Sequence, residues 1–336
     1  MIRKSQQGVA LLIVLLIMAL MTTVAVRMAS RMFANLNRVE SQLRYQQAYW
    51  YAQSVESLVR YGIGKSINNE DHVTLSQFLS LRYQIYPIDR GQATSSVFDR
   101  QACFNVNSLR DIKPTTNGTN PFLVDVLQQL IESQDIDSFE AETAAASTWE
   151  YIDIDTTVQS RLGVEDSKYE VRQLAHVIPN GFMADISEWR AVNGVSQEMF
   201  EKVSPFLCAL PNSKLVLNVN SLLKKDTPLL TAMFYPNLSD DQAKQLISGR
   251  NTIDGWKNIA SFMTEPALIH IEKQEKKRVL PFFEVQSVYF ELDTKITIDS
   301  TTLRMRVLLK RNKNGTVTVT RRRFGGMSER NPDNQV

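Results

Sequence analysis

The sequence has few of the side chains from which most enzyme active sites are built. It contains three scattered histidines and two cysteines that belong to no metal-binding spacing. No nucleophile-elbow, HExxH, P-loop or dinucleotide-binding glycine pattern occurs in it. No pair of acidic residues is marked out by an apolar setting as a general acid and base. We therefore expect no enzymatic activity and propose no catalytic residue.

A strong charge bias is also absent. With 38 basic and 36 acidic residues the net charge is +2, which gives no indication of a nucleic-acid partner. Segments 191–195 and 245–250 resemble helix-hairpin-helix elements, which bind phosphates through glycine-rich hairpin amides. Each hairpin has only one glycine, and the region 132–170 is rich in acids. We therefore expect packing hairpins and no nucleic acid, with a membrane-anchored helix-hairpin-helix protein as an alternative.

The N-terminus holds the one strongly biased segment of the chain. Residues 9–26 contain no charge, no Gly and no Pro, and their only polar residues are two threonines. A helix of 18 residues just spans about 30 Å of hydrocarbon. A cleavable secretory signal is disfavoured, because the apolar run is long and Ala25-Val26-Arg27 is a poor cleavage site. We expect a single uncleaved span, although Arg27 and Arg31 after it leave the positive-inside rule only weakly in favour of a cytoplasmic N-terminus.

The rest of the chain alternates between helical and strand-like patterns. After the span no Pro or Gly appears before Gly62, and the apolar spacing predicts one helix from Val9 to about Tyr61, amphipathic in its second half. Strand-like pieces follow at 82–88, 93–98 and 102–106, and return near the C-terminus around a hairpin turn at Asn314-Gly315. The middle reads as helices, for example at 121–133, 186–192, 197–207, 240–248 and 256–263, with a capping box at Ser239 and Gln242.

This order predicts an α+β fold. A long N-terminal helix packs on a small antiparallel sheet, and a large all-α domain is inserted into the sheet. We expect a transmembrane half-helix at 9–26, the amphipathic helix and first strands at 27–108, the inserted domain at 109–278, the last strands at 279–325 and a tail at 326–336.

One internal repeat divides the inserted domain. The segment 104–109, FNVNSL, resembles 217–222, LNVNSL, and each is followed within six residues by a proline and then a helix. Two similar helical subdomains are therefore expected. Cys103 and Cys208 each lie within about ten residues of a repeat copy. In a reducing compartment they would be buried thiols; if the copies lie side by side in an oxidising one, a disulfide is feasible and its long loop contributes up to about 4 kcal/mol.

The first residues carry a resemblance to a known class of leader. Met1 to Gly8, MIRKSQQG, followed by the apolar helix, resembles a prepilin-type leader. In that family a membrane aspartic peptidase cuts after the glycine and methylates the new amine. The resemblance implies cleavage between Gly8 and Val9, a cytoplasmic leader and an exported remainder. Two positions depart from the usual pattern: Val9 stands where most members have Phe, and Ile13 where most pilins have Glu.

The missing glutamate is informative. In pilin filaments that buried carboxylate pairs with the N-terminal amine of the preceding subunit, and an unpaired carboxylate in hydrocarbon is costly. A subunit with no predecessor is better served by an aliphatic residue. This pattern resembles the general secretion pathway protein K family, a minor pseudopilin of type II secretion. Further segments resemble its motifs, namely 104–109, 151–155, 163–169, 188–195 and 285–290.

The resemblance implies a pilin-like fold and a structural role. We expect a minor pseudopilin that caps the tip of the periplasmic pseudopilus and helps initiate its assembly for protein export across the outer membrane. Its partners would be the other minor pseudopilins of the tip, packed on the amphipathic half-helix from Leu36 to Leu58, and the prepilin peptidase. It would be a single-pass protein of the bacterial inner membrane, with a periplasmic ectodomain. A type IV pilus minor pilin is an alternative, disfavoured by the inserted domain and by Ile13.

Four acidic residues are candidates for a metal site. Asp153 and Asp155 are followed ten residues later by Glu165 and Asp166, with Gly163 between them. Ca²⁺ takes six to eight oxygen ligands, and carboxylates suit it. The spacing does not match an EF-hand, and composition alone favours a solvated loop or helix caps. The resemblance implies calcium, because the family binds it in the inserted domain and these acids fall on two of its motifs.

Overall fold

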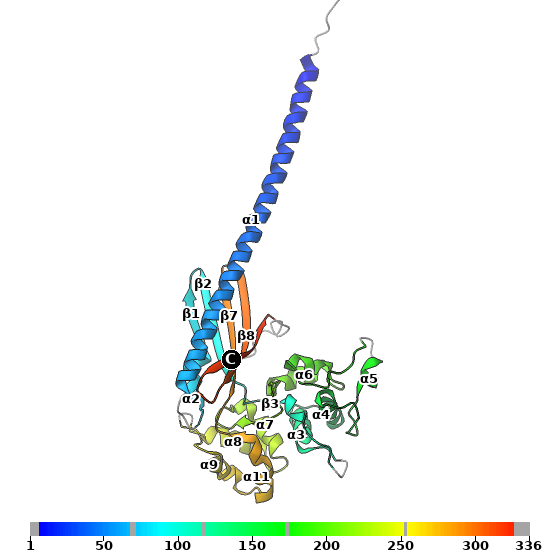
Figure 1. The fold of residues 1–336 in the computed structure, drawn as a ribbon, viewed down its shortest axis with the longest axis vertical. Helices are drawn as coiled ribbons and strands as arrows, with labels where there is room; N and C mark the ends of the chain where they lie inside the picture. Colours follow the sequence, from blue (N-terminus) through cyan, green and yellow to red (C-terminus); the bar gives the residue numbers. More distant parts are fainter. Residues whose placement is uncertain (1–6, 68–71, 116–118, 172–174, 252–253, 326–336) are drawn as a thin grey trace, which may run out of the picture.

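The computed structural model describes residues 7–67, 72–115, 119–171, 175–251 and 254–325. A long helix lies with its C-terminal part against a five-stranded sheet, and a group of shorter helices lies beyond the far end of the sheet (Figure 1). The fold is the predicted α+β arrangement.

Helix α1 runs over Gln7–Ser66, somewhat further than the sequence predicted. Its N-terminal part projects freely, and the apolar side chains there are exposed. The C-terminal part buries Ala48, Ala52, Val55, Val59 and Ile63 against the sheet at spacings of three and four residues. The last turns of the helix contain two glycines, Gly62 and Gly64. Glycine suits position 64 because the neighbouring chain comes close: a Cβ there would lie 3.2 Å from the Gly315 carbonyl oxygen.

The sheet is antiparallel, and its strands lie in the order β1 Gln84–Ile88, β2 Gly91–Asp99, β7 Tyr289–Ile298, β8 Thr301–Arg311 and β9 Val317–Phe324. Alternating apolar side chains of β7 and β8, from Phe290 to Leu309, face α1 and form one core with it. The chain leaves the sheet after β2 and returns in β7, which pairs with β2 from Gly91↔Ile298 to Asp99↔Phe290. The helical domain is therefore an insertion between two adjacent strands. A short helix, α2 Leu75–Arg82, precedes the first strand of the sheet.

The inserted domain has its own core and two consecutive parts. The predicted segment 186–192 is a 3-10 turn rather than an α-helix, and the predicted segment 197–207 ends early because Pro205 starts a separate turn. The first part comprises β3 Phe104–Asn105, η1 Val106–Leu109, α3 Phe122–Glu132, α4 Ser138–Ile152, α5 Asp166–Glu170, η2 Ile186–Ala191, α6 Gln197–Val203, η3 Ser204–Phe206 and β4 Leu207–Cys208. The second comprises β5 Leu217–Asn218, η4 Lys224–Asp226, α7 Thr227–Met233, α8 Asp240–Gly249, α9 Ile259–Met263, α10 Pro266–Ile269, α11 Lys273–Val279, η5 Leu280–Phe282 and β6 Phe283–Glu284.

Both parts are built on the same hydrogen-bond plan. The Asn107 side chain donates to the Met183 carbonyl at 2.9 Å and accepts from the Met183 amide at 2.8 Å. Asn220 makes the same two bonds, at the same distances, to the backbone of Trp256. Each part closes with a Pro-Phe 3-10 turn and a short strand parallel to its own first strand. The repeated asparagines thus hold equivalent chain crossings in two similar subdomains.

Polar contacts join the inserted domain to the sheet. Asp99, the last residue of β2, accepts hydrogen bonds from the hydroxyls of Ser221 and Ser287. Burial raises the pKa of Asp99, and these hydrogen bonds oppose that rise. On the other side Asp185 forms an ion pair with Arg323 of β9. The two subdomains are therefore each fixed to the sheet by a carboxylate.

Candidate functional site

Three carboxylates converge where α4 ends and α5 begins. One oxygen each from Glu150, Asp153 and Glu165 lies within 4.8 Å of the others. Glu150 is in the last turn of α4, Asp153 is its C-cap and Glu165 is the N-cap residue of α5. All three side chains are buried, with exposed fractions of 0%, 3% and 6%. Acids at a helix C-terminus face the negative end of the helix dipole, so this placement is unfavourable without a cation.

Most of the carboxylate oxygens in this cluster have no donor. Glu150 Oε2, Asp153 Oδ1 and both Oε atoms of Glu165 are buried and make no hydrogen bond within the described part of the chain. The side-chain oxygen of Gln159 beside them is in the same condition. Leaving a buried polar atom unpaired costs about 1–3 kcal/mol, and more for a charged group. Five unpaired oxygens are a suitable donor set for a hard cation such as Ca²⁺.

Burial and mutual repulsion raise the pKa values of two carboxyl groups in the cluster. Burial, followed by the negative charges of Glu150, Asp155 and Glu165, raises the pKa of Asp153 to about 7. Burial and the neighbouring acids, Glu150 first, likewise raise the pKa of Glu165 to about 7. Arg110 lowers the pKa of Asp153 without cancelling these effects. The site is therefore short of positive charge near neutral pH.

The loop after α4 wraps around Glu150. Its Oε1 accepts hydrogen bonds from the backbone N–H of Gln159 at 2.9 Å and from the backbone N–H and the hydroxyl of Ser160 at 2.7 and 2.6 Å. These bonds leave Oε2 directed elsewhere and unpaired. A Cβ at Gly163 would lie 2.5 Å from Glu150 Cγ, so only glycine permits the loop to pass here. The sequence thus shapes the loop to present one oxygen of Glu150.

The four acids proposed from the sequence are placed differently. Asp153 and Glu165 belong to the cluster, whereas Asp155 is exposed and accepts a hydrogen bond from Gln159 Nε2 at 2.6 Å. Asp166 accepts from the Ile178 amide at 2.9 Å and so holds the following segment in place. The sequence missed Glu150, whose only signal was a charged residue inside a buried, aromatic-rich turn of helix. The predicted metal role of these acids stays a prediction.

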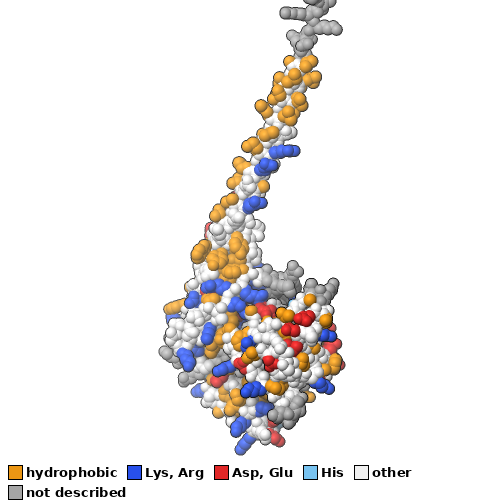
Figure 2. All heavy atoms as spheres, turned by 45° about the vertical axis from the view of Figure 1, so that its right-hand side comes forward, with side chains coloured by type: hydrophobic (Ala, Val, Ile, Leu, Met, Phe, Trp, Pro, Cys, Tyr) orange, Lys and Arg blue, Asp and Glu red, His pale blue; other side chains and the backbone are white. Residues whose placement is uncertain are grey.

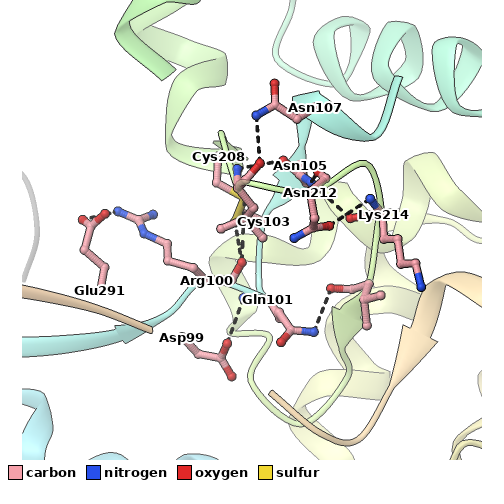
Figure 3. The surroundings of a disulfide bond; sticks show 12 residues. Asp99, Arg100, Gln101, Cys103, Asn105, Asn107, Cys208, Asn212, Lys214 and Glu291 are labelled. Carbon is pink, nitrogen blue, oxygen red and sulfur yellow. Dashed lines mark hydrogen bonds and ion pairs between the residues drawn. A yellow bond between two sulfur atoms is a disulfide. The ribbon is translucent and has the colours of Figure 1, made fainter. Parts of the chain in front are cut away.

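The two cysteines lie at the base of the first subdomain. Cys103 and Cys208 form a disulfide there, with a Cα–Cα distance of 5.8 Å (Figure 3). The bond lies beside the paired strands β3 and β4, in which Asn105 is opposite Cys208. Arg100 next to it forms an ion pair with Glu291 of β7 at 2.6 Å. The first and last elements of this subdomain are thus joined covalently close to the sheet.

The N-terminal features fit a single-span anchor. Residues 1–6 of the leader lie outside the described residues, and Gly8 and Val9 stand at the start of α1. Within the described chain, α1 is the one helix long and apolar enough to cross a membrane, and none of its apolar window is buried. Predicted cleavage between Gly8 and Val9 stays a prediction.

An apolar stripe continues along α1 beyond this window. Leu36, Val39, Leu43, Trp50 and Leu58 are 47–68% exposed. At about 100° per residue they fall on the side of α1 opposite the residues that pack on the sheet. This stripe is the surface that the sequence predicted for partner helices. The structure leaves it uncovered along the side of the molecule.

Comparison with known proteins identifies the family. Two family models described as type II secretion system protein K match residues 102–212 and 217–280. Type II secretion system protein K of Pectobacterium carotovorum is 31% identical over 98% of this chain and all of that protein. The Aeromonas hydrophila protein K is 30% identical over 96% of this chain and 98% of its own length.

A solved structure agrees with these matches. A chain in the crystal structure of the GspK-GspI-GspJ complex from the enterotoxigenic Escherichia coli type 2 secretion system superposes with a TM-score of 0.79. It is 35% identical, and the match covers 86% of this chain and 99% of that chain. The two alternatives considered from the sequence, a type IV pilus minor pilin and a nucleic-acid-binding protein, find no support in these matches. The chain belongs to the protein K family of the type II secretion system and is a minor pseudopilin.

Proposed function

We propose that this minor pseudopilin caps the tip of the periplasmic pseudopilus and helps initiate its assembly. The observation that carries the proposal is the position of the inserted domain, which lies beyond the end of α1 furthest from the span (Figure 1). A like subunit added above would need the space that this domain fills. Ile13 in place of a glutamate supports the same position, because a tip subunit has no preceding amine to pair with.

The partners are the other minor pseudopilins of the tip. The matched E. coli chain was solved in a complex with GspI and GspJ. In this chain the stripe from Leu36 to Leu58 supplies an exposed apolar helix face of the kind that packs against a parallel helix. Trp50, 68% exposed, has the size and position of an anchor residue.

Co-purification of the full chain with its partner pseudopilins tests this assignment. Trp50→Arg should abolish co-purification, because it places a charge in the apolar stripe. Gln42→Arg is the matched control, since it adds the same charge to an exposed position about 100° from Leu43 around the helix. Unchanged recovery of partners with Trp50→Arg would exclude the stripe as the interface.

The chain is matured and placed as prepilins are. In this proposal the prepilin peptidase cleaves between Gly8 and Val9 and methylates the new amine, and residues 9–26 hold the chain in the inner membrane with a periplasmic ectodomain. Gly8→Leu should block cleavage, because a side chain before the cut obstructs the peptidase. Intact-mass analysis of the protein from cells with active peptidase reads this out, and retention of Met1 in the unmutated chain contradicts it.

The acidic cluster binds a structural calcium ion in this proposal. Glu150, Asp153 and Glu165 would be the ligands, with the side-chain oxygen of Gln159 as a neutral donor. The cation would neutralise three buried carboxylates and hold the loop from α4 to α5 in place. The proposal rests on the unpaired buried oxygens and the raised pKa values of Asp153 and Glu165.

A further inference from the structure

The segment of α1 between the span and the sheet carries positive charge without compensation. No acidic residue occurs between Val9 and Val39, and Glu40 is the first acid. Arg44 further along pairs with Glu40 at 3.4 Å. Arg27, Arg31 and Arg38 are exposed, and none of them has an ion pair or hydrogen bond with another part of the described chain. Figure 2 shows basic side chains on this free part of the helix, next to the apolar ones.

The three arginines share one side of the helix. They are spaced by four and seven residues, which at about 100° per residue places them within about 40° of one another. The apolar residues Leu36 and Leu43 fall about 150° away from this cationic side. The helix therefore leaves the apolar window with one basic face and one apolar face, and the two faces suit different partners.

If residues 9–26 span the membrane, the first two arginines come to lie at the level of the lipid headgroups. An 18-residue helix from Val9 to Val26 rises about 27 Å, close to the hydrocarbon thickness of about 30 Å. Arg27 follows directly and Arg31 lies one turn further. A guanidinium group binds phosphate oxygens through two parallel hydrogen bonds. Arginine on the exported side of a span runs against the positive-inside tendency, so two arginines here are unusual for an exported flank.

We propose that Arg27 and Arg31 bind the phosphate groups of anionic phospholipids in the outward-facing leaflet, helped by Arg38 about two helical turns further out. These contacts fix the depth of α1 in the membrane. They also fix its rotation, because the basic face turns to the headgroups while the stripe from Leu36 to Leu58 stays free for a partner helix. The inference rests on the proposed span over residues 9–26.

Lipid titration of the full chain tests the proposal. The chain, purified in a zwitterionic detergent, is titrated with phosphatidylglycerol or phosphatidylcholine, and bound lipid is counted by native mass spectrometry. Phosphatidylglycerol should bind more tightly than phosphatidylcholine, and its binding should weaken with added salt. Arg27→Gln with Arg31→Gln should weaken phosphatidylglycerol binding about 30-fold, which corresponds to about 1 kcal/mol per arginine.

Controls separate this role from others. Arg44→Gln removes an arginine that already has a partner and should leave lipid binding unchanged. Arg27→Lys with Arg31→Lys keeps the charge and should retain most of the lipid selectivity. Equal binding of the two lipids, full binding by the glutamine variant or displacement of the lipid by excess inorganic phosphate would each overturn the proposal. So would a glutamine variant that keeps its lipid but loses its partner pseudopilins, since the arginines would then pair with protein carboxylates. Membrane retention of the glutamine variants shows separately that the span is intact.

Discussion

Replacing Glu150 by glutamine should have opposite effects with and without calcium. Glu150 is fully buried, and its charge raises the pKa values of both Asp153 and Glu165. Without metal, glutamine removes one of three mutually repelling carboxylates, so the metal-free protein should become more stable. With calcium, the substitution removes a charged ligand, so the stabilisation by the ion should be lost.

The size of the calcium effect follows from linkage. A ligand present at 100 times its dissociation constant stabilises the folded state by about 2.7 kcal/mol. For a unit of about 150–250 residues, the size range of the inserted domain, 1 kcal/mol shifts the melting temperature by roughly 2–4 °C. Calcium should therefore raise the melting midpoint of the inserted domain in the unmutated protein by about 5–10 °C. Calcium should raise the melting temperature of Glu150→Gln hardly at all. In chelator, Glu150→Gln should melt at a higher temperature than the unmutated protein.

Differential scanning calorimetry at neutral pH, in chelator and in millimolar calcium, measures all four midpoints. Glu140→Gln is the matched control, because it removes an exposed acid from the first turn of the same helix, α4. That variant should keep the full rise with calcium. The reasoning is refuted if the unmutated protein melts at the same temperature in both buffers, or if Glu150→Gln keeps the calcium-dependent rise.

Three further predictions follow from the same contacts. In chelator the protein should lose stability as pH rises from about 4 to 7, because the raised pKa values of Asp153 and Glu165 mean that the unfolded chain releases these protons at lower pH than the folded protein does. Melting curves at pH 5.5 and 7.5 measure this, and a higher melting temperature at pH 7.5 would contradict it. Gly163→Ala should weaken calcium binding in a calorimetric titration by displacing Glu150 Cγ, and unchanged affinity would show that the loop has room. Replacing both Cys103 and Cys208 by alanine should lower the free energy of unfolding by about 4 kcal/mol in denaturant titrations, and no loss would disprove the stabilising role of this cross-link.

The parts of the fold that follow simple periodicities could be predicted from the sequence. Helix α1 has a long uninterrupted pattern, and the β8–β9 hairpin has Asn314-Gly315 at its turn, where Gly315 adopts a positive φ of 80°. Helix α2 was missed because its eight residues carry little amphipathic pattern and lie next to strand-like sequence. The two subdomains were predicted from the repeated asparagines. Their hydrogen-bond partners could not be predicted, because Met183 and Trp256 are different residue types that are bound through their backbone atoms.

The candidate site was only half predictable for a related reason. Asp153 and Glu165 were predicted from the family resemblance, because they fall on two of the family's motifs, whereas composition alone favoured a solvated loop or helix caps. Glu150 sits in a helix between Trp149 and Tyr151, where the sequence gives no sign that its side chain turns towards the loop. Its role depends on hydrogen bonds from Gln159 and Ser160 that form only when the loop folds back.

Copy number along the pseudopilus tests the central claim most directly. Pseudopili assembled in cells and sheared off can be separated by length, and this chain can be quantified in each fraction by mass spectrometry and located by antibody labelling. A tip cap predicts a copy number that does not change with filament length, with label at one end only. A copy number proportional to length, or label spread along the filament, would contradict the account.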